Sequence, residues 1–110
     1  MGDGADVLYI DKSVTADAEI TAGSGDDLII YAGSGSATIE GQSGNNEIYL
    51  GKGGGTIFGG IGDDEIFGGE GNATLHGGEG SNFIDGQAGN NTIYGGIGND
   101  LIRGGTDNDR

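Results

Sequence analysis

The sequence predicts an all-β fold, a right-handed parallel β-solenoid of about six coils with two strands in each coil. Three observations predict it. Branched apolar residues recur at a near-constant spacing of nine, glycine supplies 28 of the 110 residues, and proline, cysteine and tryptophan are absent. A chain so poor in large apolar residues has little material for a conventional core. A stack of short similar units, in contrast, buries one apolar residue from each unit against its neighbours.

The apolar residues define position 8 of a nine-residue unit: Leu8, Ile20, Ile29, Ile39, Ile48, Ile57, Ile66, Leu75, Ile84, Ile93 and Ile102. Position 4 is glycine in every unit but one, and glycine is also frequent at position 2. Glycine accepts the backbone angles of tight turns at low cost. Alternation around position 8 points that side chain inward and its neighbours outward. Each unit is therefore expected to form a turn and a short strand, and two units to form one coil.

The repeat covers the whole chain, so we expect a single domain, residues 1–110. Residues 1–21 are expected to form an irregular N-terminal coil, because Ile10, Asp11 and Lys12 are additional to the repeat and the next unit has no glycine. Residues 22–103 are regular nonapeptide repeats with one inserted residue, Tyr31. Residues 104–110 are a truncated last repeat.

The charge of the chain indicates which partners it can have. Acidic residues outnumber basic residues 18 to 4, which gives a formal net charge of −14. Nucleic acid is disfavoured as a partner because phosphates are bound by clustered Lys and Arg. Cations are favoured because they relieve the repulsion within a compact acidic fold. No apolar run is long enough for membrane insertion, and no set of residues supports an enzyme.

The repeat is best preserved at residues 59–67 (GGIGDDEIF) and 95–103 (GGIGNDLIR). Its pattern, G-G-x-G-x-D-x-U-x with U large and apolar, resembles the RTX family of haemolysin-type nonapeptide calcium-binding repeats. The resemblance implies a β-roll whose turns bind Ca²⁺ between neighbouring coils, through the aspartate at position 6 and backbone carbonyls. It also implies that Ca²⁺ orders the chain, and that the protein is extracellular, either secreted or on the cell surface.

Position 6 divides into two rows, because alternate units lie on opposite edges of the solenoid. On the first edge the row has an oxygen ligand in every coil: Asp6, Asp27, Asn46, Asp64, Asn82 and Asp100. On the second edge it has none until its last two members: Ala18, Ala37, Gly55, Ala73, Asn91 and Asp109. We therefore expect one row of Ca²⁺ sites, on the first edge. Sites beside the asparagines should be weaker because an amide keeps the oxygen and loses the charge.

An alternative interpretation is that these side chains only stabilise turns. Asp and Asn favour turns because they accept hydrogen bonds from nearby backbone amides. This interpretation is preferred for Asn91 and Asp109. The residues inserted after Asp6 make its gap to Asp27 the least regular of the row.

The predicted function is a calcium-binding module that folds or is stabilised on binding Ca²⁺ and is attached to further domains of a longer chain. One alternative is a self-assembling, filament-forming solenoid that associates end to end, with Ca²⁺ as a structural ion, because solenoid ends expose strand edges. A more distant alternative, ice binding, depends on a row of threonines at position 7 of the second edge: Thr38, Thr56, Thr74 and Thr92. A structural Thr stack between strands is the preferred interpretation of that row.

Overall fold

The fold is described by a computed structural model that covers residues 1–110. It contains thirteen short strands and no helix that could cross a membrane. The strands are β1 (Gly2–Asp3), β2 (Val7–Ile10), β3 (Ala18–Thr21), β4 (Gly23–Ser24), β5 (Leu28–Tyr31), β6 (Ala37–Glu40), β7 (Glu47–Tyr49), β8 (Gly55–Ile61), β9 (Glu65–Phe67), β10 (Ala73–Glu79), β11 (Phe83–Asp85), β12 (Thr92–Ile97) and β13 (Leu101–Arg103).

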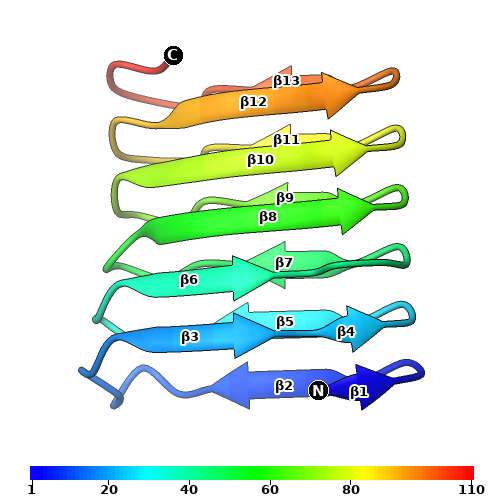
Figure 1. Cartoon of the computed structure of the whole chain (residues 1–110). Coiled ribbons are helices and arrows are strands. Elements are labelled where there is room, and N and C mark those ends of the chain that lie inside the picture. The colour runs from blue at the N-terminus through cyan, green and yellow to red at the C-terminus, as the bar shows by residue number, and fades with distance from the viewer.

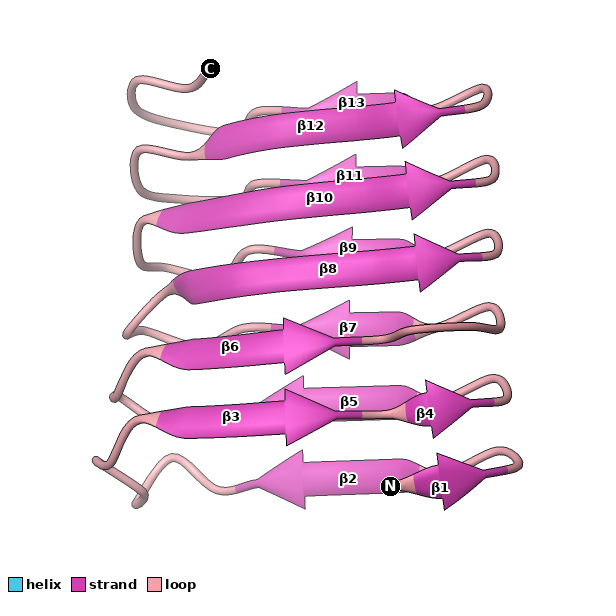
Figure 2. Ribbon diagram, in the orientation of Figure 1, coloured by secondary structure: helices cyan, strands magenta, loops and turns pink.

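Two parallel sheets lie back to back and build a stack of about six coils (Figure 1). One sheet has the order β13-β11-β9-β7-β5-β2 and the other β12-β10-β8-β6-β3, and β1 and β4 form a separate parallel pair. Each strand therefore pairs with a strand two units away. Turns close both edges of every coil (Figure 2). The whole molecule is a flat slab of 31 × 30 × 13 Å. The parallel β-solenoid predicted from the nine-residue spacing is confirmed.

The position 8 side chains form the dry interior between the two sheets. In the middle of the stack they are completely buried, from Ile29 through Ile57 to Ile84. The parallel registers place each of them beside its equivalent in the next coil, as in Ile48 with Ile66 and Ile39 with Ile57. At the C-terminal end of the stack Ile102 is 45 % exposed, because no strand covers β13. The ladder of apolar residues is therefore a core only where coils lie on both sides.

The two insertions in the repeat belong together. Ile10 and Tyr31 each lengthen their strand to four residues, and they are paired with each other where β2 meets β5. Tyr31 is buried, and its hydroxyl donates a hydrogen bond of 2.8 Å to the carbonyl of Ala16, in the unit that lacks glycine. The large side chain thus anchors the irregular unit, and β3 still pairs in register with β6.

The outer face of the five-stranded sheet carries two regular columns. Thr38, Thr56, Thr74 and Thr92 follow one another in register at position 7. At position 9 the ring of His76 is stacked between Phe58 and Tyr94, with both centroid distances 4.7 Å. The opposite sheet has a similar column in Tyr49 and Phe67, stacked at 4.6 Å. Such pairs add stabilisation beyond simple burial, so these aromatic residues pack across neighbouring strands, along the direction in which the coils stack.

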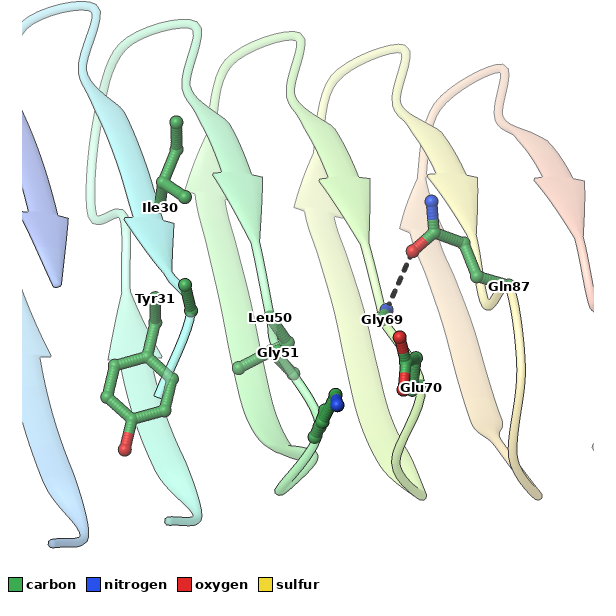
Figure 3. Close-up of a pocket in the computed structure, with 9 residues that line it drawn as sticks. Ile30, Tyr31, Leu50, Gly51, Gly69, Glu70 and Gln87 are labelled. Carbon is green, nitrogen blue, oxygen red and sulfur yellow. Dashed lines mark hydrogen bonds between the residues drawn. The ribbon is translucent and has the colours of Figure 1, made fainter. Parts of the chain in front are cut away.

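A shallow groove of about 280 Å³ runs along the second edge of the slab (Figure 3). Tyr31, Leu50 and Gln87 line it, and Gln87 accepts a hydrogen bond of 2.9 Å from the N–H of Gly69. The groove lies on the opposite edge from the turns that join β8 to β9, β10 to β11 and β12 to β13, which are at the right of Figure 1.

The burial of the Ile ladder predicts a position-dependent cost of truncation. Ile57→Ala should lower the free energy of unfolding by about 2–5 kcal/mol, because it empties a closely packed site between Ile39 and Leu75. Ile102→Ala is the matched control, with the same substitution at the same position of the repeat, and should cost clearly less. Urea unfolding followed by circular dichroism at one fixed Ca²⁺ concentration measures both. Equal losses in the two variants would contradict this account of the core.

Candidate metal centre

Each turn of the first edge spans positions 1–6 and is built from closely stacked backbone. In the turn at residues 59–64, Gly60 and Gly62 have positive φ angles of 105° and 132°. A Cβ atom at Gly60 would lie 2.1 Å from the carbonyl oxygen of Gln42 in the preceding coil. Glycine is therefore required both for the turn angles and for the close approach of successive coils. This stacking brings the position 6 side chains of successive coils together along one line.

The position 6 side chains form a continuous hydrogen-bonded ladder. In every coil after the first, one side-chain oxygen accepts the backbone N–H of position 6 in the preceding coil, at 2.7–3.0 Å. The members in chain order are Asp6, Asp27, Asn46, Asp64, Asn82 and Asp100. The four inner members are almost completely buried. All six residues predicted from the sequence therefore lie in one row, and one oxygen of each inner member performs the turn-stabilising role.

In three of the four aspartates of the row the second carboxylate oxygen is buried without a partner. The Oδ2 atoms of Asp6, Asp27 and Asp64 are buried and make no hydrogen bond within the chain. In the turn of Asp64 this oxygen lies so close to Gly59 that a Cβ atom there would be 2.5 Å away. A buried carboxylate oxygen without a donor is costly. Each of these turns therefore holds an anionic atom that needs a positive partner.

Burial is visible in the acid–base behaviour of Asp64. It raises the pKa of that carboxyl from 3.8 to about 6, although hydrogen bonds from Asn46 lower the pKa, and the neighbouring charge of Asp63 raises it further. The largest cause is the loss of solvent around the charged form. The carboxylate is thus held in an environment that favours its neutralisation.

The asparagines of the row place an amide nitrogen, which is a hydrogen-bond donor, where the aspartates place their second oxygen. The Nδ2 atom of Asn46 donates to the carbonyl of Gly44 at 3.3 Å, whereas that of Asn82 is buried without a partner. On the second edge Asn91 repeats the arrangement. Its Oδ1 accepts the N–H of Ala73, and its own N–H donates to Asp109. Asn91 and Asp109 thus each accept a backbone N–H of the preceding coil, the contact that the turn-stabilising interpretation requires.

A second ladder, at position 5, was missed by the sequence reasoning. Its side chains are exposed, and each accepts the backbone N–H of position 5 in the following coil, as Asp63 does from Ser81 at 2.7 Å. On the first edge the accepting side chains are those of Asp26, Asn45 and Asp63, and Ser81 contributes only its backbone N–H. The recurrence of Asp, Asn and Ser just before position 6 was the signal that could have revealed it.

The ligands available to a metal ion are mostly backbone atoms. The chain contains no group of three or more His, Cys, Asp or Glu side chains that could hold a metal ion. The turns of Asp6, Asp27 and Asp64 each offer one unpaired carboxylate oxygen, and at Asp64 the Cβ position of Gly59 lies 2.5 Å both from that oxygen and from the backbone carbonyl oxygen of Gly77. Ca²⁺ takes six to eight oxygen ligands, carbonyls included, in flexible geometry. The residues present fit that ion, provided that carbonyls of adjacent turns supply most of its ligands.

The family model for the RTX calcium-binding nonapeptide repeat (4 copies) matches this chain at residues 31–54, 51–75 and 76–110. The match covers well over half of the chain, so the protein belongs to the RTX calcium-binding nonapeptide repeat family. Comparisons with curated proteins and with solved structures gave no match. The repeat resemblance drawn from the sequence is confirmed.

The raised pKa of Asp64 predicts that acid stabilises the metal-free fold. The carboxyl titrates near 6 when folded and near 4 when unfolded, so the folded chain takes up this proton first. The resulting stabilisation is complete below about pH 4 and is lost as pH rises through about 6. At full size it amounts to about 3 kcal/mol at most.

Urea unfolding of the metal-stripped chain at neutral and mildly acidic pH measures this effect. Asp64→Asn should abolish this component of the pH dependence. Asp63→Asn, which removes the same charge from the exposed neighbour, should retain most of it. An unchanged pH dependence in Asp64→Asn would contradict the assignment.

Proposed function

We propose that the chain is a calcium-binding β-roll module, stabilised or folded by Ca²⁺ bound in one row along its first edge. The observation that carries the proposal is the set of buried carboxylate oxygens of Asp6, Asp27 and Asp64, which have no hydrogen-bond partner. A divalent cation would contact these oxygens and so neutralise the charge of the carboxylates to which they belong. The row that would hold the ions is the position 6 ladder, with Asp27, Asp64 and Asp100 as its principal charged members and Asn46 and Asn82 between them.

The chemistry of the turns supports Ca²⁺ over Mg²⁺. Mg²⁺ requires a near-ideal octahedron and retains water, whereas Ca²⁺ accepts many carbonyl oxygens in irregular geometry. When bound, the ion would supply positive charge and cross-link neighbouring turns. Because it would bind the folded stack and not the unfolded chain, its binding free energy would add to stability. The net charge of −14 favours the same outcome.

The proposed setting is extracellular, in a secreted or cell-surface protein with further domains. Membership of the RTX repeat family supports this setting, and weak calcium modules depend on the millimolar Ca²⁺ found outside cells. We assign the chain no catalytic role. Its single histidine, His76, is occupied in an aromatic stack with Phe58 and Tyr94.

Ca²⁺ should raise the urea midpoint of the wild-type chain and bind as several ions per chain in isothermal titration calorimetry. Asp64→Asn should lower the stoichiometry and reduce the stabilisation by Ca²⁺, because it removes one inner carboxylate. Asp63→Asn is the control and should leave the stoichiometry unchanged, since its side chain faces solvent. A wild-type chain whose midpoint and heat signal do not respond to millimolar Ca²⁺ would refute the proposed function.

A second candidate function, end-to-end assembly, is favoured by the exposed apolar residues of the last coil. Ile97, Leu101 and Ile102 are 74 %, 57 % and 45 % exposed, and the outer edge of β13 is unpaired. We expect the chain to self-associate at high concentration with Ca²⁺ held fixed, and Leu101→Lys to weaken that association. Sedimentation velocity across a concentration series measures it. A wild-type monomer throughout the series would exclude assembly by the chain alone.

A further inference from the structure

The turn of Asn91 is closed by three hydrogen bonds from one nitrogen. Its Nδ2 atom donates to the carbonyls of Gly86, Ala88 and Gly89, at 3.0, 3.2 and 3.1 Å. These are positions 1, 3 and 4 of the repeat unit. The orientation of the amide is fixed chemically, because its Oδ1 accepts the N–H of Ala73 and only the nitrogen can donate to carbonyls. A partially positive group therefore sits at the centre of this ring of carbonyl oxygens.

The aspartate turns have the same shape around an atom of the opposite character. Asn91 holds its nitrogen over Gly86, where a Cβ atom would lie 2.7 Å from it. Asp64 holds Oδ2 over Gly59 in the same way, at 2.5 Å. Because the two turns are equivalent, the carbonyls of positions 1, 3 and 4 in the Asp64 turn face a carboxylate oxygen. That oxygen can only accept a hydrogen bond, and the chain supplies no donor to it. Carbonyls and carboxylate together need a positive partner that the chain does not provide.

We propose that asparagine at position 6 is a built-in substitute for a bound cation, whose amide nitrogen closes the turn that an aspartate leaves dependent on an ion. The identity of the ion as Ca²⁺ rests on the proposed function. The closure itself depends only on the contacts of the asparagines and the unpaired oxygens of the aspartates. On one repeated backbone the chain thus contains aspartate turns that depend on a cation and asparagine turns that are closed from within, fully at Asn91 and in part at Asn46.

The order of the two kinds along the first edge spaces the ions. Asp27, Asp64 and Asp100 alternate with Asn46 and Asn82, so cation-dependent turns are separated by one asparagine turn. At a coil spacing of about 4.8 Å, this alternation doubles the distance between bound ions and halves their mutual repulsion.

The asparagines differ in how many carbonyls their side-chain nitrogen reaches. Asn91 reaches three carbonyls and Asn46 one, whereas the nitrogen of Asn82 reaches none.

The first experiment converts the best-closed turn into an open one. In excess chelator, Asn91→Asp should raise the unfolding equilibrium constant at least about tenfold, because a buried donor becomes an unpaired acceptor. Asn90→Asp is the matched control. It adds the same charge at the exposed neighbouring residue and keeps the oxygen that accepts the N–H of Asn108, so it should change the constant little. Equal effects of the two substitutions would overturn the proposal.

The reverse experiment remains informative if Asn91→Asp fails to fold. Asp64→Asn should lower the unfolding equilibrium constant in chelator several-fold relative to Asp63→Asn, because the amide supplies the missing donor in a side chain of the same size. A merely structural role for the position 6 oxygen predicts no such gain, since both residues keep that oxygen. An Asp64→Asn chain no more stable than Asp63→Asn would overturn the proposal.

Ca²⁺ rescue separates the proposal from the function on which it rests. Saturating Ca²⁺ should restore most of the stability lost by Asn91→Asp and add about one bound ion per chain, but should not restore Asn91→Ala, which lacks the carboxylate. Equal restoration of both variants, or of neither while wild type binds Ca²⁺, would overturn the proposal. If the wild-type chain binds no Ca²⁺, the proposed function fails, and the two experiments in chelator still decide the closure.

Discussion

The buried side chain at position 6, which accepts a backbone N–H from the coil before it, is the interaction on which the rest of the structure depends. The interior of Ile and Leu is non-directional, so it drives the stack together without fixing how one coil sits on the next. The hydrogen bonds from Asn46 to Asp64 and from Asp64 to Asn82 provide that direction. They connect residues 18 apart and therefore fix the two-unit coil and its register.

The same interaction creates an electrostatic conflict. A carboxylate that accepts this N–H is buried in the turn. In Asp64 its second oxygen is left without a donor, and burial raises the pKa of the carboxyl to about 6. The proposed binding of Ca²⁺ along the row would resolve this conflict, and membership of a calcium-binding repeat family supports that proposal. Ions in every coil would repel strongly. At about 4.8 Å two divalent ions repel by about 3 kcal/mol even in water, and at twice the distance by half as much. The alternation of aspartate with asparagine reduces this cost.

The fold was accessible from the sequence because one apolar residue recurs every nine residues and its period matches a turn and a strand. The row of Asp27, Asn46 and Asp64 was accessible for the same reason. The atom that each position 6 side chain turns toward the carbonyls of its turn was not accessible. A repeat pattern treats Asp and Asn as equivalent, and only the structure shows that one presents an oxygen and the other a nitrogen. The pairing of Ile10 with Tyr31 was also missed, since each insertion on its own looks like an error of register, and only the sheet shows that they compensate.

Diffraction from crystals grown with Ca²⁺, or with a lanthanide in its place, would locate each ion by its anomalous scattering. We expect ions in contact with Asp64 and Asp100 on the first edge, and none in the second-edge turns of Ala37, Gly55 and Ala73. Ions distributed equally over both edges, or no ions on the first edge at millimolar Ca²⁺, would contradict this expectation.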